Sequence, residues 1–116
     1  MRHCNGNRKL SRPTDQRMAL LYGIVTALMI NGKVKVTVPR AKEARKIADK
    51  IITLAKYGDL ASRRKVFSII RDRDIVKKIF TEIPSRYEGR PGGYTRIVRI
   101  APHLGDAAPM ALLELV

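Results

Sequence analysis

The spacing of apolar residues along the chain predicts helices over most of its length and strands mainly near its end. From residue 14 to residue 83, most apolar residues recur every three or four positions, the period of a helix with one buried face. Residues 33–38 instead alternate apolar with polar side chains, and residues 94–100 are rich in β-branched ones, as is typical of strands. The predicted order is helix, strand, three helices and two strands.

The first helix is expected to begin beside Thr14, whose hydroxyl would cap it, with Asp15 favourably placed in the first turn. Asn31-Gly32 supplies the left-handed backbone conformations that end a helix. The strand at residues 33–38 places three valines on one face and two lysines and a threonine on the other, so one face is expected to be buried. In the first helix, the apolar residues that form one buried stripe are Met18, Leu21, Tyr22, Val25, Leu28 and Met29.

Three more helices are expected between residues 39 and 83. The first begins at Pro39, the second follows a break at residues 57–59, and the third restarts at residues 71–74 and is stopped by Pro84. In the second of these helices we expect Val66, Phe67 and Ile70 to be buried and Arg63, Arg64 and Lys65 to be exposed. In the helix that begins at Pro39, the residues expected to face outward are Arg40, Lys42, Glu43, Arg45, Lys46, Asp49 and Lys50.

Two strands are expected at residues 94–100 and 109–116, joined as an antiparallel hairpin by the intervening residues 101–108. The predicted fold class is α+β, a three-stranded mixed sheet with helices packed on one face. Residues 1–13 carry four cations and almost nothing apolar, so they are expected to form a flexible basic arm. A single domain is expected over residues 14–116.

The net charge of the chain indicates which class of partner it binds. Its 116 residues include 24 Lys and Arg against 10 Asp and Glu, a net charge of +14 that attracts polyanions. Nucleic acid is therefore the leading partner class. Residues 100–116 contain two acids, Asp106 and Glu114, and no cation, so the last strand is expected to belong to the core and not to a contact surface.

The sequence gives no sign of a disulfide or of membrane insertion. Its single cysteine, Cys4, excludes an internal disulfide and fits a reducing cytosol. Residues 18–30 form an apolar run after a basic segment, as in a signal peptide, but no small residues stand at the cleavage spacing before residues 31–33. The run is also far shorter than the ~20 residues that span a bilayer. We expect a cytoplasmic protein with no membrane partner.

No constellation of residues indicates catalysis, a metal or a cofactor. His3 and His103 have no Ser, Cys or carboxylate at a spacing that local structure reliably brings together, and His3-Cys4 supplies two adjacent metal ligands without two more. The acids of residues 71–74 are interpreted as helix caps. Residues 89–93 lack the Gly-Lys-Ser/Thr ending of a nucleotide-binding loop and precede a strand. We expect no enzyme, no cofactor, no metal and no small-molecule substrate.

The unbalanced cations are the candidate binding residues, and contacts to phosphates are their expected role. Aromatic residues make up 5% of the chain, so base stacking is not expected to be the main mode of binding. Gly92-Gly93 either lets the backbone approach an RNA groove or forms a flexible turn before a strand. Without RNA, residues 1–12 and 85–92 are expected to be mobile. The candidate nucleic-acid-binding residues are Arg2, Arg8, Lys9, Arg12, Arg17, Arg63, Arg64, Lys65, Arg86, Arg90, Gly92, Gly93, Arg96 and Arg99.

Several motifs along the whole chain resemble those of the bacterial large-subunit ribosomal protein seventeen family. The most specific are Gly92-Gly93-Tyr94-Thr95-Arg96-Ile97, and Gly105-Asp106-Ala107-Ala108-Pro109-Met110-Ala111 with Glu114-Leu115-Val116. The Met-Arg-His opening, Leu10-Ser11-Arg12, Leu54-Ala55-Lys56 and Arg63-Arg64 add to the likeness. Cys4 departs from it, because the family usually shows a basic residue there.

The resemblance implies a structural, non-catalytic protein of the large ribosomal subunit. It implies binding to the large-subunit ribosomal RNA near the rim of the peptide exit tunnel, beside other ribosomal proteins. The residues that it places at motif positions, where contact with RNA is expected, are Arg2, His3, Arg12, Arg63, Arg64, Tyr94 and Arg96.

Two alternatives follow from composition alone. A DNA-binding or nucleoid-associated protein would use the helices of residues 39–83, with Arg63-Arg64-Lys65 on a recognition helix. An RNA-modifying enzyme is the weaker alternative, because no acid, base or nucleophile constellation supports it.

Overall fold

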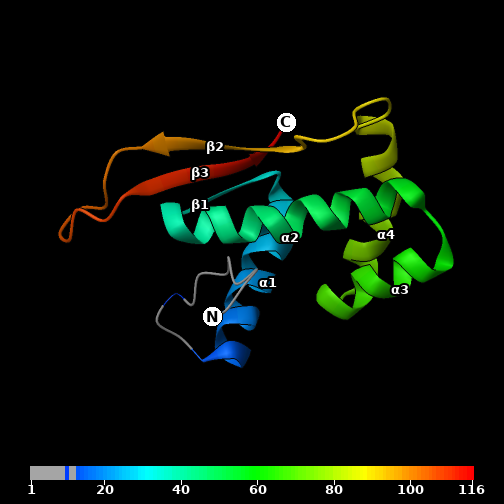
Figure 1. Ribbon diagram of the computed structural model, residues 1–116, viewed down its shortest axis with the longest axis horizontal. Helices are drawn as coiled ribbons and strands as arrows, with labels where there is room; N and C mark the ends of the chain where they lie inside the picture. Colours follow the sequence, from blue (N-terminus) through cyan, green and yellow to red (C-terminus); the bar gives the residue numbers. More distant parts are fainter. Residues whose placement is uncertain (1–9, 11–12) are drawn as a thin grey trace, which may run out of the picture.

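The computed structural model describes Leu10 and residues 13–116, which form helices and a three-stranded sheet (Figure 1). The predicted arm therefore lies almost wholly outside the described residues. The α+β class and the predicted order of elements are confirmed. The elements are α1 (Thr14–Asn31), β1 (Lys33–Thr37), α2 (Val38–Tyr57), α3 (Leu60–Ile69), α4 (Arg73–Arg86), β2 (Thr95–Ile100) and β3 (Met110–Leu115).

The sheet has the order β1-β3-β2, and β3 is antiparallel to both of its neighbours. The expectation of a mixed sheet was wrong in this detail. β1 and β2 point the same way, but β3 separates them, so no parallel pair forms. The central place of β3 confirms that the last strand belongs to the core, since Ala111, Leu113 and Leu115 are all buried.

Helices α1 and α2 cover one face of the sheet, and α3 and α4 pack mainly against the C-terminal half of α2 (Figure 1). The Thr95 hydroxyl donates a hydrogen bond to Asp49 Oδ1 of α2 at 3.0 Å, which marks the covered side of β2. Because side chains alternate along a strand, Ile97 and Arg99 share that side. The opposite, open face of the sheet holds Lys33, Lys35, Thr37, Arg96, Val98, Ile100, Met110, Leu112 and Glu114.

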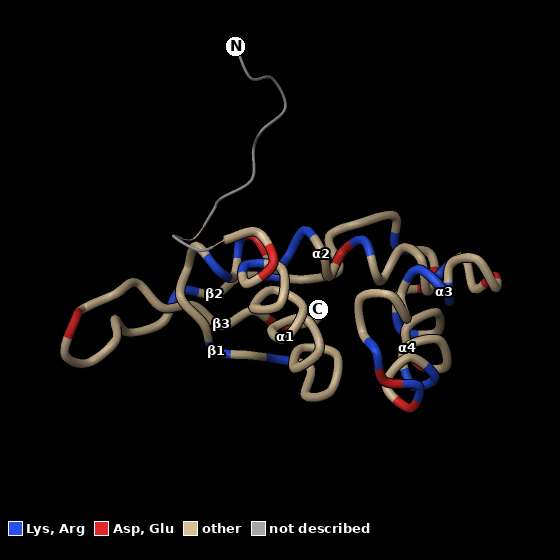
Figure 2. Tube along the Cα trace, turned by 90° about the horizontal axis from the view of Figure 1, so that it is seen from below, with Lys and Arg blue, Asp and Glu red and all other residues tan. Residues whose placement is uncertain are grey.

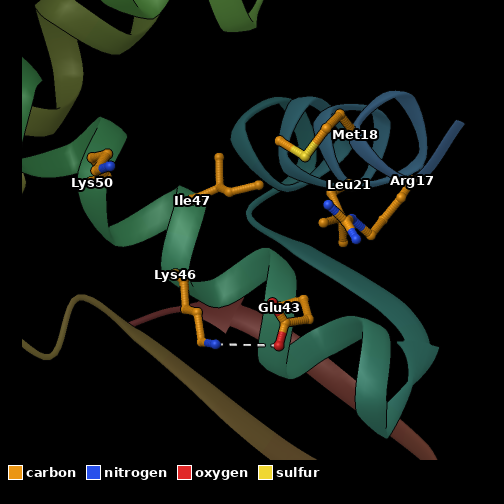
Figure 3. A pocket seen from close by; sticks show the side chains of 7 residues that line it. All are labelled: Arg17, Met18, Leu21, Glu43, Lys46, Ile47 and Lys50. Carbon is orange, nitrogen blue, oxygen red and sulfur yellow. Dashed lines mark hydrogen bonds and ion pairs between the residues drawn. The ribbon is translucent and has the colours of Figure 1, made fainter. Parts of the chain in front are cut away.

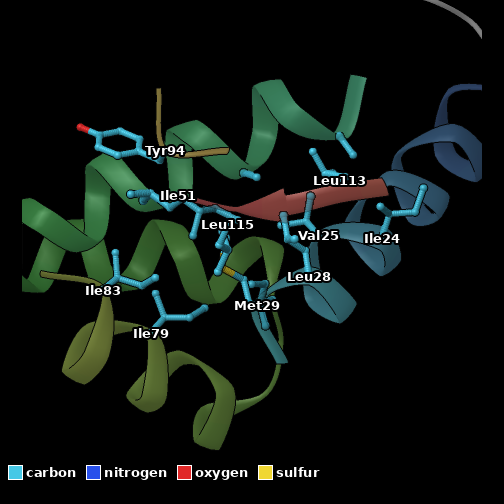
Figure 4. Packing of buried hydrophobic residues seen from close by; sticks show 14 of the residues in the cluster. Ile24, Val25, Leu28, Met29, Ile51, Ile79, Ile83, Tyr94, Leu113 and Leu115 are labelled. Atoms are coloured by element: carbon cyan, nitrogen blue, oxygen red, sulfur yellow. The ribbon is translucent and has the colours of Figure 1, made fainter. Parts of the chain in front are cut away.

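The core joins α1, α2, α4 and β3 (Figure 4). Val25 and Leu28 of α1, Ile51 of α2 and Leu113 of β3 are fully buried within it. Four of the buried residues of α2 are alanines, and their small side chains let neighbouring elements approach the helix closely. These alanines are Ala41, Ala44, Ala48 and Ala55, each fully buried.

Most helix ends follow the sequence-based expectations. Gly32 ends α1 with a φ of 81° and Gly58 ends α2 with a φ of 69°, both in the left-handed region that favours glycine. Asp59 caps α3, and its Oδ1 accepts from Ser62 N at 2.8 Å. Asp72 caps α4 through the N–H groups of Asp74 and Ile75. Both acids therefore serve helix termini, as predicted for the Asp72 segment.

Four expectations about local structure were wrong. Thr14 is the first residue of α1, after Pro13, and makes no capping hydrogen bond. Pro84 lies inside α4, where it removes one intrahelical bond without ending the helix, which continues to Arg86. Val38 begins α2 instead of ending β1, and its N–H donates to Pro109 O at 3.0 Å. Phe67 is 40% exposed, because α3 turns it toward a groove described below.

Within the described residues, no helix combines the length and the apolar composition needed to cross a membrane.

Leu113 and Leu112 are adjacent on β3 but face opposite sides of the sheet, which makes them a matched pair. We expect Leu113→Ala to lower the free energy of unfolding by about 2–5 kcal/mol, because it leaves a cavity in the core. We expect Leu112→Ala, on the open face, to cost roughly 1 kcal/mol. Urea unfolding of both variants measures the difference. Equal losses would mean that the open face is as enclosed as the core.

The Asp59 cap should make stability depend on pH. Its pKa is lowered from the usual value by the hydrogen bonds with Ser62, so the carboxylate stabilises the folded state above its unfolded pKa of about 4. This contribution is lost as pH falls through the lower, folded pKa. We expect Asp59→Ala to lower the melting temperature at pH 7 and the gap from the parent protein to shrink at lower pH. A gap that persists unchanged to pH 2 would contradict this role.

Candidate nucleic-acid interface

A groove of about 570 Å³ between α3 and α4 brings four cations together. Its cations are Arg63, Arg64, Arg73 and Lys77, and its remaining lining is Leu60, Phe67, Asp74 and Val76. All four cations are exposed, and one acid faces them. Cations around an apolar floor suit a nucleic acid strand, whose phosphates would meet the rim and whose sugar or base would meet Leu60 and Phe67.

The geometry of the two helices fixes this groove. The Arg63 guanidinium lies 5.6 Å from the centre of the Phe80 ring of α4, close enough for a cation–π contact that orients the side chain. Asp59 and Asp72 cap the helices, so these acids are used at the helix ends, where their charge also suits the helix dipole. Of the predicted cluster, Arg63 and Arg64 enter the groove, whereas Lys65 is exposed outside it.

The basic loop before β2 is tied to α2 by Lys56. The ammonium of Lys56 donates to the carbonyl of Arg90 and, at 3.2 Å, to the hydroxyl of Tyr94, and it lies 5.1 Å from the centre of the Tyr94 ring. Arg90 is also bonded within the loop, because its Nε donates to Gly92 O at 3.3 Å. These hydrogen bonds hold the loop in place, and the side chain of Arg90 is exposed on it. Its mobility in the absence of RNA stays a prediction.

Tyr94 is a core residue, although it was predicted as a candidate RNA contact. It is 4% exposed, and its ring packs edge-on against Tyr87 with the ring centres 5.1 Å apart. The Tyr87 hydroxyl donates to Tyr94 O at 3.1 Å, and burial raises the pKa of Tyr87. Gly93 has a φ of 65°, so the turn before Tyr94 needs glycine for its backbone conformation.

Arg86 is held by the C-terminal end of the chain. Its guanidinium donates to Leu115 O and to Val116 O, each at 3.2 Å, and lies 5.7 Å from the centre of the Tyr87 ring. These contacts satisfy carbonyls at the end of β3, so the structure gives Arg86 a structural role that leaves less of it for an external phosphate.

Arg96 and Arg99, both predicted to contact RNA, face different sides of the sheet. They are three residues apart on β2, so they lie on opposite faces of the sheet. Arg96 is on the open face and pairs with Glu114 of β3. Arg99 is exposed at the edge of the covered face. The two arginines therefore meet different surroundings.

Arg17 lies at a second hollow, of about 310 Å³, between α1 and α2 (Figure 3). Glu43 lines it as well and is buried, although the sequence predicted it on the outward side of α2. Lys46 donates to Glu43 Oε1 at 3.2 Å, as the dashed line in Figure 3 marks. A paired carboxylate tolerates this burial far better than an isolated one would. The hollow is lined by Arg17, Met18, Leu21, Glu43, Lys46, Ile47 and Lys50.

The structure adds cations that were not among the predicted site residues. Arg73 and Lys77 are four residues apart on α4 and share the groove with Arg63 and Arg64. That spacing on one helix face was the available signal, but only the packing of α3 on α4 shows that the two pairs meet. Lys42, Arg45 and Lys50 are also exposed on α2, one of the helices along which Figure 2 shows basic positions.

His103 lies near a carboxylate, contrary to the sequence-based expectation. Its Nδ1 is 3.0 Å from Asp106 Oδ1 across a turn of the β2–β3 loop. The N–H of Ala108 and the His103 ring lower the pKa of Asp106. The pair is exposed, and with the hydrogen bond from Ala108 N to Asp106 Oδ1 it stabilises the turn. Among residues 10 and 13–116, no group of three or more His, Cys, Asp or Glu side chains is arranged to hold a metal.

The remaining predicted contacts lie outside the described residues. They are Arg2, His3, Arg8, Lys9 and Arg12, all of the arm, together with the neighbouring Cys4.

Comparison with known proteins gives one consistent match. The sequence model of the family "Ribosomal protein L17" matches residues 20–116. The large ribosomal subunit protein bL17 of Myxococcus xanthus is 54% identical over 116 residues, which cover 100% of this chain and 84% of that protein. The proteins of the same name from Clostridium acetobutylicum and Clostridium tetani are 52% and 50% identical over 112 and 111 residues, covering 97% and 96% of this chain and 98% of each relative.

The Lys56 contacts should hold the basic loop in place. We expect Lys56→Met to speed amide hydrogen exchange in residues 88–93 and to cost about 1 kcal/mol of stability, because it removes bonds to Arg90 O and the Tyr94 hydroxyl. Mass spectrometry of exchange measures the effect, with Lys42→Met on the exposed face of α2 as the matched control. Unchanged exchange in the loop would show that Lys56 does not position it.

Proposed function

Because the chain belongs to the ribosomal protein L17 family, we propose that its cationic surfaces bind ribosomal RNA within the large ribosomal subunit. Members of this family are structural, non-enzymatic components of the ribosome, in agreement with the prediction of no enzyme. The observation that carries the proposal is the family match over residues 20–116 in a chain with a net charge of +14. The protein acts by binding without turnover in the bacterial cytoplasm.

The resemblance of the motifs supports a finer location. It favours the rim of the peptide exit tunnel, beside other ribosomal proteins. There the protein would hold ribosomal RNA segments together and fix their positions.

The α3–α4 groove is the leading surface for RNA. Three arginines line it, and the planar guanidinium group binds phosphate oxygens in pairs, which gives orientation as well as attraction. The two capping acids, Asp59 and Asp72, are occupied by backbone N–H groups. The groove lining itself holds four cations against one acid, Asp74, so its rim carries an excess of positive charge.

The basic loop and the α2 face would add contacts around this groove. Arg90 is exposed on a loop that Lys56 ties to α2, so little further ordering is needed when it meets a phosphate. Double-stranded RNA is recognised mainly through its shape and backbone, which suits surfaces rich in cations and poor in aromatic side chains. The release of counterions from the RNA then contributes affinity, and the fixed spacing of the cations determines where on the RNA the protein binds.

Salt dependence tests the contact with phosphates. If about six phosphates are neutralised, affinity for a large-subunit ribosomal RNA fragment should fall by roughly a thousandfold between 50 and 200 mM salt. We expect Arg64→Gln to weaken binding and to lower the slope against salt by about one. Lys65→Gln removes the same charge from the next residue, outside the groove, and should leave the slope nearly unchanged. Equal effects of the two variants would exclude the groove as the contact.

Sedimentation tests the ribosomal assignment itself. We expect the protein in a cell lysate to migrate with the large subunit on a sucrose gradient at moderate salt and to be released at high salt, because RNA contacts are screened. A protein found free, or on chromosomal DNA, would overturn the assignment. The second outcome would favour the nucleoid alternative, with α3 on DNA.

A further inference from the structure

The β2–β3 hairpin differs from the rest of this basic protein. Residues 100–116 contain no Lys or Arg, although the whole chain has 24. In Figure 1 the hairpin loop projects past the start of α2, and Figure 2 shows one acidic segment and no basic one at its tip. This part of the molecule is therefore reachable by a partner and poorly suited to phosphates.

The open face of this hairpin is apolar. Val98 pairs with Leu112 and Ile100 with Met110 across the two strands, and all four side chains lie on the face opposite the one that α1 and α2 cover. Val98 is 42% exposed. Leu104 at the loop tip is 93% exposed, although it is a large apolar side chain. We call this surface the hairpin patch, made up of Val98, Ile100, Leu104, Met110 and Leu112.

The loop that carries Leu104 is shaped by its own hydrogen bonds. His103 N donates to Ala108 O and Ala107 N donates to His103 O, both at 2.9 Å. Asp106 Oδ1 accepts from Ala108 N at 3.1 Å and lies 3.0 Å from His103 Nδ1. A loop that is already ordered loses little entropy when a partner binds. Leu104 is thus presented at the end of a formed turn.

The charges in and around the hairpin patch indicate which class of partner it fits. Asp106 at the tip repels phosphates, and the patch contains no aromatic side chain on which a base would stack. An apolar centre with charges at its rim is instead typical of protein interfaces. Here the rim is formed by Lys35, which neighbours Leu112 on β1, and by the Arg96–Glu114 ion pair.

We infer that the hairpin patch docks against an apolar surface of a neighbouring protein in the large subunit, with Leu104 as its anchor. This inference rests on the proposed function. The partner has an apolar hollow for Leu104 and an acidic group opposite Lys35, which is exposed at the patch rim. A second copy of this chain fits poorly, because two chains of +14 repel each other.

Photo-crosslinking within assembled subunits tests the partner class. A benzophenone amino acid replaces Leu104 in one strain and Arg64 in another, and large subunits are purified and irradiated. We expect the probe at position 104 to crosslink to one identified ribosomal protein and the probe at position 64 to crosslink to ribosomal RNA. Crosslinks from position 104 to RNA or to a second copy of this chain, or none at all, would overturn the inference.

A substitution measures the contribution of the anchor. We expect Leu104→Ser to leave the melting temperature of the isolated protein unchanged, because the side chain is 93% exposed. It should weaken retention on the large subunit by roughly tenfold in a moderate-salt wash, at which the parent protein stays bound and apolar contacts persist. Ile30→Ser, at an exposed position on α1 away from the patch, is the matched control.

The outcomes separate this inference from the proposed function. A protein that occupies large subunits normally, but whose Leu104→Ser variant is retained as well as the parent, would refute the docking of the hairpin alone. A protein absent from large subunits would overturn both proposals.

Discussion

Helix α2 packs against every other helix and strand of the described chain. It can do so because Ala41, Ala44, Ala48 and Ala55 leave room for strands and helices to approach its backbone. At its middle, Asp49 accepts a hydrogen bond from Thr95 of β2. The placement of the sheet, the basic loop and the α3–α4 pair all depends on this helix.

The positions of the acids explain how the fold tolerates a charge of +14. Asp59 and Asp72 stabilise helix N-termini, and Glu114 pairs with Arg96 on the sheet. The acids therefore act locally, where each supports a turn or a strand pair, and leave the groove cations largely unneutralised. Such a distribution costs self-repulsion in the free protein, which a polyanion relieves on binding.

Local signals in the sequence predicted much of the fold. Helical spacing, the glycines at 32 and 58 and the aspartates before α3 and α4 act within a few residues, so the order of elements and most helix ends could be inferred. The antiparallel sheet could not, because strand order depends on how β1 meets β3 across more than 70 residues of chain.

The candidate site was less predictable for the same reason. Tyr94 was predicted to contact RNA, but its ring is buried and its hydroxyl accepts a hydrogen bond from Lys56, 38 residues away in sequence. Arg86 was assigned to RNA, but it meets the carbonyl of Val116, 30 residues away. A cation in a sequence shows its charge and not its intramolecular partner, so only the folded chain separates the structural arginines from the available ones.

The loops at the two ends of β2 belong to two different kinds of surface. At its beginning, Lys56 and Tyr87 tie the basic loop to the core, so that Arg90 is presented where α2 and α4 carry other cations. At its end, the bonds of His103 and Asp106 shape a turn around Leu104 that contains no Lys or Arg. Since β2 is rigidly paired with β3, the distance between the two loops is fixed. We propose that RNA lies at one end of this strand and a protein neighbour at the other, so that the fold sets their separation.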